Sequence, residues 1–234
     1  GGDMAGNGEK YHMWKEHFFN KQSRLISQIP FFGCVGNHDR WTKNTWAFLQ
    51  GPYPLDPQAE FYSFEYGDAH FLILNTQVNT TMSYAQAKFA RQSLAANRLP
   101  WSIVAFHKSA FCAGGHEEDR DMVIMTREIF EPAGVDIVLT GHNHFYQHNL
   151  VNGVHHFVMG PAGARLRPPH LAEYTQKAVK GYNFGLFTVT PESLKLTVYG
   201  AENKVLDTLE LQKPAAAKAA LLDERRLSPL LLKL

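Results

Sequence analysis

The stretch Val135-Asp136-Ile137-Val138-Leu139-Thr140-Gly141-His142-Asn143-His144 runs from an apolar segment directly into a loop with two histidines. Its apolar first half predicts a buried strand. Two other apolar runs end in the same way: 31–35 leads into Gly36-Asn37-His38-Asp39, and 102–106 leads into His107. Loops that follow the strands of a sheet are where α/β proteins place functional side chains, because the sheet holds the strand ends rigidly. We therefore expect the polar residues of the three loops to converge.

The residue types in these loops favour a metal centre. Imidazole nitrogens together with amide or carboxylate oxygens suit borderline metals such as Zn, Fe or Mn. Asp3, on a fourth loop, offers a carboxylate that could bridge two ions. Paired ions clamp a phosphoryl group and lower the pKa of a bound water. Each residue alone has a plainer explanation: His107 could be a satisfied polar group, and Asp39 could cap a turn. The hypothesis of a metal centre therefore rests on the combination of these residues.

The remaining pattern predicts one α/β domain. Helices are expected between the loop 1–8 and Pro30, at 84–97 and at 119–130, and a hairpin around Gly67-Asp68. Further strands are expected at the following positions, the last four as a meander: 61–66, 70–75, 155–159, 184–190, 194–199 and 205–211. The domain is expected to span 1–212, followed by a helical or disordered tail at 213–234.

The composition bounds the function. Hydrophobic residues make up 44% and charged residues 19% of the 234-residue chain, which is typical of a soluble globular protein. The formal charge is +1 and the basic residues are scattered, which argues against nucleic acid or an anionic membrane as the main partner. No apolar run reaches the length of a membrane span. The pattern leaves the compartment and the oligomeric state open.

The ordered set of motifs resembles a known family. Gly1-Gly2-Asp3, Gly36-Asn37-His38-Asp39, His107 and Gly141-His142-Asn143-His144 resemble, in this order, the later motifs of the calcineurin-like metallophosphoesterases. The resemblance covers roughly 1–211 and is closest to the purple-acid-phosphatase-like branch, to which 143–146, 152–154 and 160–164 are also similar. It implies a four-layer α/β/β/α sandwich with the metals at one edge.

The resemblance also implies metal ligands. Asp3 matches the carboxylate that bridges both metals. Asn37, His107 and His142 match the other ligands of one metal, and His144 matches a ligand of the second. Two divalent or trivalent ions are therefore expected, with Zn, Fe and Mn all left open.

Three further residues are expected to act on substrate or on its neighbours. His38 matches the imidazole beside the phosphate, which stabilises charge or protonates the leaving group. Asp39 is expected to orient that imidazole. His116 lies where this branch often has a substrate-facing histidine; a loop residue on the surface is the alternative.

The sequence departs from the family pattern at two points. The first motif, Asp-x-His on an earlier strand, is not matched, so the resemblance implies an N-terminally incomplete fold and two fewer ligands for the metal of His144. Purple acid phosphatases have a metal-binding Tyr three residues after the bridging Asp, where this chain has Gly6. Iron–tyrosinate chemistry is therefore not implied.

The expected function is hydrolysis of a small phosphomonoester or phosphodiester by metal-bound hydroxide at a dinuclear centre. The alternative is a catalytically inactive fragment that binds one metal or none. A zinc-dependent amide or ester hydrolase would also use histidine loops, but the order of the motifs speaks against it.

Overall fold

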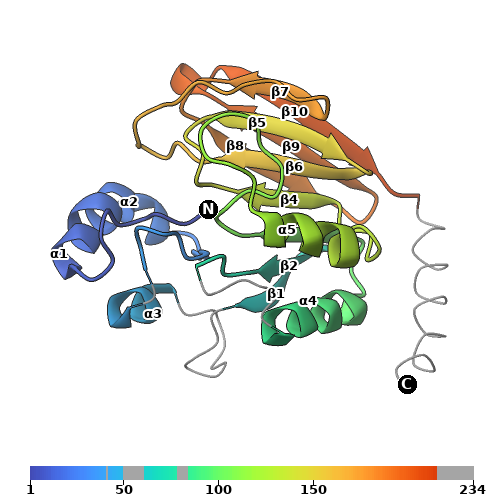
Figure 1. Cartoon of the computed structure of the whole chain (residues 1–234), viewed down its shortest axis with the longest axis horizontal. Helices are drawn as coiled ribbons and strands as arrows, with labels where there is room; N and C mark the ends of the chain where they lie inside the picture. The colour runs from blue at the N-terminus through green and yellow to red at the C-terminus, as the bar shows by residue number, and fades with distance from the viewer. Residues whose placement is uncertain (41, 50–60, 78–83, 215–234) are drawn as a thin grey trace.

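The computed structural model describes residues 1–40, 42–49, 61–77 and 84–214 (Figure 1). Its strands are β1 (Tyr62–Tyr66), β2 (Ala69–Ile73), β3 (Trp101–Ala105), β4 (Ile137–Thr140), β5 (Tyr146–Val151), β6 (Val154–Met159), β7 (Thr175–Val179), β8 (Phe184–Val189), β9 (Ser193–Tyr199) and β10 (Val205–Gln212). Seven of them form a mixed sheet in the order β1-β2-β3-β4-β6-β5-β7, and three form an antiparallel sheet in the order β10-β9-β8.

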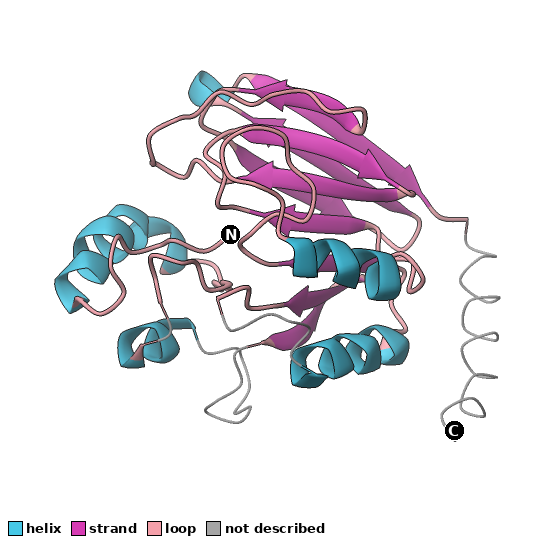
Figure 2. Cartoon of the chain, viewed as in Figure 1, coloured by secondary structure: helices cyan, strands magenta, loops and turns pink. Residues whose placement is uncertain are grey.

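Along the chain, the helices come mostly before and between the strands; Figure 2 shows them in cyan. The bounds are α1 (Tyr11–Met13), η1 (Trp14–Phe19), α2 (Asn20–Ile26), α3 (Lys43–Leu49), α4 (Tyr84–Ala96), α5 (Arg120–Met125), η2 (Thr126–Phe130) and η3 (Ala201–Asn203). The first three run on as one helical segment whose middle part has π-type turns. Within the described residues, no helix is both long enough and apolar enough to cross a membrane.

The larger sheet is buried on both faces because its strands carry apolar residues on alternate sides. Along β3, Val104 packs with α4 and α5 on one face, and Ile103 packs with β9 on the other. Figure 1 shows α4 and α5 along the larger sheet and α1 to α3 grouped at one end. The described residues therefore form three of the four expected layers: helices, large sheet and small sheet.

Parallel pairing at the centre of the larger sheet positions the histidine loops. The strands β2, β3, β4 and β6 run parallel to one another. The ladder between β3 and β4 continues past the strand ends, where the Gly141 N–H donates to the His107 carbonyl over 3.0 Å. Parallel neighbours end at the same edge of a sheet, so the loops after β3 and β4 begin side by side.

Most predicted elements are confirmed, including the α/β class, the hairpin β1–β2, the helices near 84–97 and 119–130, and the strands β8 to β10. The first helix is also confirmed, and it buries Trp14 and Phe18. Leu25 and Ile29, further along this segment, are about half exposed. The helix ends at Ile26 and leaves Ile29 beyond it.

Two strand predictions are wrong in detail. In the run 31–35, residues 33–35 are buried near β1 and Phe31 is 42% exposed, and the run forms no strand among the described residues. Phe32 stacks on Phe64 at 4.1 Å, and the Tyr62 hydroxyl donates to the Gly33 carbonyl. The apolar pattern of this run predicted that residues 33–35 are buried, but it did not show whether their backbone pairs with a neighbouring strand. The segment 155–159 is a strand, but it belongs to the larger sheet and pairs in parallel with β4, outside the meander of β8 to β10. The expected tail, 213–234, lies outside the described residues from 215 onward.

The two sheets are joined through Trp101, and this contact predicts a graded loss of stability. Its buried indole N–H donates to the Thr190 carbonyl over 2.7 Å. Trp101→Phe removes this hydrogen bond to Thr190, an exposed residue, and should lower the free energy of unfolding by about 0.5–1.5 kcal/mol. Trp101→Ala should cost about 3–5 kcal/mol because it also opens a cavity. Urea unfolding measures both, with the exposed Tyr66→Phe as a control; equal losses in the two Trp101 variants would contradict this account.

Acid should destabilise the fold through His156 on β6, which is 2% exposed and whose ring nitrogens have no hydrogen-bond partner in the part of the chain that the structure describes. Burial, and then the charge of His155, lowers the pKa of His156 from 6.5 to about 3. The unfolded chain therefore binds a proton that the folded chain does not, and stability falls as pH drops below 6.5. His156→Leu should flatten this decline without loss at neutral pH. Denaturant midpoints from pH 7 to 4 test this, with the exposed His12→Leu as control; an unchanged pH slope would refute it.

Candidate metal centre

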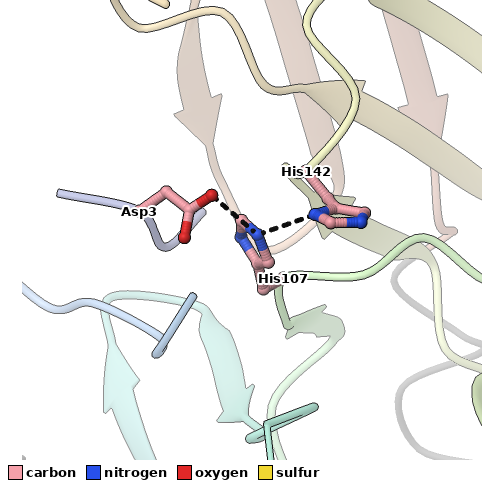
Figure 3. Close-up of side chains that lie close together, drawn as sticks. All are labelled: Asp3, His107 and His142. Atoms are coloured by element: carbon pink, nitrogen blue, oxygen red, sulfur yellow. Dashed lines mark hydrogen bonds and ion pairs between the residues drawn. The ribbon is translucent and has the colours of Figure 1, made fainter. Parts of the chain in front are cut away.

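The side chains expected to bind metal meet around one atom, Nε2 of His107. That nitrogen lies 3.0 Å from Oδ1 of Asn37, 3.1 Å from Nδ1 of His142 and 3.2 Å from Oδ2 of Asp3. Figure 3 shows Asp3, His107 and His142 turned toward one another. The ligand atoms of these three residues all lie within 4.8 Å of one another. The structure therefore brings together all four residues that were predicted for one metal.

The hydrogen bonding of His107 makes this convergence fit a cation. Its Nδ1 lies 2.6 Å from the Gly1 carbonyl, which only accepts, so Nδ1 carries the ring proton. In the neutral ring, Nε2 then presents a lone pair to the oxygens of Asp3 and Asn37, an arrangement that a positive ion between them would stabilise. Neighbouring ligands of a tetrahedral ion with bonds of about 2.0–2.1 Å lie about 3.3 Å apart, close to the spacing found here.

The electrostatics prepare the ligands for a metal at neutral pH. Burial alone would raise the pKa of Asp3. A His107 ring protonated on both nitrogens donates a hydrogen bond to Asp3, and this bond and the charge of the ring outweigh burial and lower the Asp3 pKa; a metal ion would take the place of the Nε2 proton. Burial, and then the charge of His107, lowers the pKa of His142 to about 3. Asp3 is therefore ionised and His142 neutral at neutral pH, which are the states that bind metal.

Close backbone approach places Asp3 against the turn that carries Asn37. A Cβ at Gly36 would lie 2.2 Å from both the backbone nitrogen and Oδ1 of Asp3. Asp3 itself has a φ of 57°. Only glycine at position 36 leaves room for Asp3 in this conformation, and this is the physical reason for the glycine before Asn37.

His144, predicted to bind a second metal, lies apart from the four. It lines the same pocket of about 90 Å³ as Asp3, His107 and His142. Its Nδ1 lies 3.0 Å from the Arg165 carbonyl, so Nε2 is the nitrogen with a free lone pair. The only group of three or more metal-binding side chains found in the described part of the chain is Asp3, His107 and His142.

The residues predicted to act on substrate take different positions. His38 is exposed, and its Nδ1 lies 3.3 Å from the Gly6 carbonyl. Asp39 is fully buried and accepts hydrogen bonds from the backbone N–H groups of Asp3, Ala5 and Gly36. No hydrogen bond joins Asp39 to the His38 ring among the described residues. The expectation that Asp39 orients His38 is therefore wrong, because the Asp39 oxygens are occupied by backbone donors.

His116 lies at the centre, in contact with His142. The two rings stack with centroids 4.1 Å apart, and the His116 N–H donates to Oδ1 of Asn143 over 2.6 Å. Burial, and then the charge of Arg167, lowers the pKa of His116. Sequence reasoning missed the part played by Asn143, which is fully buried and also donates to Cys112 Sγ. The signal in the sequence that could have found Asn143 is its position between two loop histidines, His142 and His144.

The sequence profile described as "Calcineurin-like phosphoesterase" matches residues 1–146, more than half of the chain. The chain belongs to this family. Asp3, Asn37, His38, His107, His142 and His144 all lie within the matched part.

Several curated relatives of the chain are named as acid phosphatases or purple acid phosphatases. Acid phosphatase type 7 of Danio rerio is 25% identical over 167 residues, which is 56% of this chain and 36% of the relative. Probable inactive purple acid phosphatase 9 of Arabidopsis thaliana is 22% identical over 264 residues, 85% of this chain and 40% of the relative. The chain thus spans less than half the length of either protein.

A solved structure supports the fold. The purple acid phosphatase PPD1 from yellow lupin (Lupinus luteus) seeds superposes with a TM-score of 0.81 over 93% of this chain and 46% of its own chain. The sequence identity is 19%, so the similarity establishes the architecture alone. It confirms the resemblance to purple acid phosphatases at the level of the fold.

The central place of His107 predicts how metal affinity responds to mutation. His107→Ala removes the nitrogen around which the other three ligands gather, so Zn²⁺ affinity should fall by at least the 10–100-fold typical of losing a supporting residue. His12→Ala, an exposed histidine in the first helix, should leave the affinity unchanged. Calorimetric titration with Zn²⁺ measures both; similar affinities for His107→Ala and the wild type would exclude this centre.

Proposed function

We propose that the chain hydrolyses phosphoesters at the centre of Asp3, Asn37, His107 and His142. The observation that carries the proposal is the convergence of three ligand atoms on His107 Nε2 at 3.0–3.2 Å. Membership of the calcineurin-like phosphoesterase family supports metal-dependent chemistry on phosphoric esters at these motifs. The proposed substrate is a small phosphoester, and residues 1–212 are the proposed phosphoesterase domain.

The residues present suit a Zn, Fe or Mn ion held by two imidazoles, one amide oxygen and one carboxylate. A bound ion supplies charge stabilisation for the phosphoryl oxygens and makes water acidic enough to act as a nucleophile at neutral pH. Asp3 brings the negative charge, and His107 is fixed in the ligating tautomer by the Gly1 carbonyl.

His38 is the proposed proton donor to the leaving group. Its Nδ1 lies 3.3 Å from the Gly6 carbonyl, so that nitrogen carries a proton and Nε2 is the one that can exchange a proton with substrate. The backbone N–H of His38 donates to Oδ1 of Asp3 over 2.8 Å, which ties this residue to the metal-binding loop. His116, stacked on His142, is proposed to contact the substrate.

A second ion is part of the proposal. Asp3 could bridge both ions, and His144 would be a ligand of the second. The Arg165 carbonyl, 3.0 Å from Nδ1 of His144, would keep the ring proton on that nitrogen and leave Nε2 to bind the ion. Two protein ligands are fewer than the three or four of a tight site, so further ligands would be needed.

The position of His144 also favours the second candidate function. A chain that holds one ion or none, without hydrolysis, would show a cluster of Asp3, His107 and His142 that His144 does not join, as in the described residues. The names of several relatives contain the words "probable inactive", a description that applies to those proteins.

Hydrolysis and metal content separate the two candidates. The full chain, loaded in turn with Zn²⁺, Mn²⁺ or Fe³⁺, is assayed with p-nitrophenyl phosphate and with its bis-ester. Metal-dependent turnover of either ester supports the proposal, and the ratio of the two assigns monoesterase or diesterase activity. Bound metal without turnover of either would favour the second candidate.

The role of His38 makes a prediction of its own. His38→Ala should lower kcat by roughly 10²–10⁴, the range for loss of a general acid, while the metal content stays that of the wild type. Atomic absorption on the purified variant measures the metal. Loss of the ion from His38→Ala would show that this residue binds metal instead of donating a proton.

A further inference from the structure

Asp39 is an aspartate that the proposed mechanism leaves without a task. It is fully buried, yet its carboxylate contacts no other charged side chain by hydrogen bond or ion pair within the described residues. Oδ2 accepts from the N–H of Asp3 over 2.6 Å and from that of Gly36 over 2.9 Å, and Oδ1 accepts from the N–H of Ala5 over 2.9 Å. Burying a carboxylate is costly, so three hydrogen bonds from one small region of backbone point to a specific role.

These hydrogen bonds hold the metal-binding loop on the turn that carries Asn37. Asp3 is fixed at both ends: Asp39 accepts from its backbone nitrogen, and the His38 N–H donates to its Oδ1 over 2.8 Å. Only Oδ2 then faces His107, at 3.2 Å. The orientation of the Asp3 carboxylate is thus set by groups of the turn 36–39.

The turn is itself anchored, so Asp39 can transmit a fixed position. The Thr45 hydroxyl donates to the Asp39 carbonyl over 2.8 Å, and the Gly8 N–H donates to the His38 carbonyl over 2.9 Å. A Cβ at Gly8 would lie 1.4 Å from the Asp39 carbonyl oxygen, so the two segments touch at their backbones. The two segments that Asp39 joins, the metal-binding loop and the turn 36–39, are therefore held in fixed positions.

We propose that Asp39 is a positioning residue for Asp3: its carboxylate clamps the backbone of residues 3–5 so that Asp3 Oδ2 is presented to the metal. The inference rests on the proposed metal centre. Under this proposal Asp39 orients Asp3 instead of His38, and a substitution of Asp39 changes the metal affinity. A merely structural role would lower stability without acting through Asp3.

Asp39→Asn tests the clamp with little change in shape. The amide keeps one acceptor and turns an NH₂ group toward at least one backbone N–H, in either orientation. Zn²⁺ affinity, measured by calorimetry on the full chain, should fall about 10–100-fold, the usual effect of losing a residue that supports a ligand. The matched control is Asp119→Asn, which alters a carboxylate that accepts the Met122 N–H at the start of α5; its Zn²⁺ affinity should equal that of the wild type.

A double-mutant cycle separates positioning from general loosening. If Asp39 acts through Asp3, then Asp39→Asn should cost no further Zn²⁺ affinity in an Asp3→Ala background. Equal losses in both backgrounds, or no loss in Asp39→Asn alone, would overturn the inference. Failure of the wild type to bind Zn²⁺ would instead overturn the proposed centre on which the inference rests.

Hydrogen exchange on the wild-type protein decides the matter if Asp39→Asn does not fold. The backbone amides of Asp3, Ala5 and Gly36 should exchange more slowly than those of an unstructured peptide. Bound Zn²⁺ should slow the exchange of Asp3 and Ala5 further, because an ion that binds only the clamped conformation stabilises it. Exchange of Asp3 and Ala5 at the rates of unstructured peptide, or no response of either to bound Zn²⁺, would contradict the clamp.

Discussion

The parallel pairing of β3 with β4 is the constraint on which the rest of the centre depends. The hydrogen bond from the Gly141 N–H to the His107 carbonyl carries the ladder into the loops, and it leaves the His107 and His142 rings 4.9 Å apart. Parallel strands of this kind require cover on both faces, which α4, α5 and the small sheet supply. Asp3 and Asn37 come from irregular segments and are brought to this fixed pair of imidazoles. The sheet provides the rigid half of the site, and the irregular N-terminal segments, held by backbone hydrogen bonds, provide the other half.

The sequence was sufficient to predict this rigid half. The apolar runs before His107 and His142 are long enough to mark buried strands, and both are strands in the structure. The sequence did not reveal β5, because three consecutive polar residues, Gln147, His148 and Asn149, interrupt its pattern. All three are buried, and long-range hydrogen bonds satisfy much of their polarity: Gln147 accepts the Ala113 N–H, and Asn149 donates to the Phe111 carbonyl. Such bonds form only in the folded chain, so local pattern could not anticipate them.

The N-terminal half, with Asp3 and Asn37, could be predicted only as a set of residue types. The motifs named Asp3 and Asn37 correctly as neighbours of the histidines, since their side chains lie beside His107. The hydrogen-bond partners of Asp39 could not be predicted because they are backbone N–H groups, which every residue except proline possesses and no motif distinguishes. The partner of the His38 ring, the Gly6 carbonyl, is likewise a backbone group. Side chains that bind backbone are therefore the part of a site that sequence reasoning assigns least well.

The central claim is that four side chains surround one ion. Anomalous diffraction at the zinc edge, on crystals of the full chain grown with Zn²⁺, tests it most directly. The account predicts a peak bonded to Oδ2 of Asp3, Oδ1 of Asn37, Nε2 of His107 and Nδ1 of His142, at about 2.0–2.2 Å from each atom. A fully occupied zinc ion elsewhere on the chain, with these four atoms still in mutual contact and no peak between them, would contradict it.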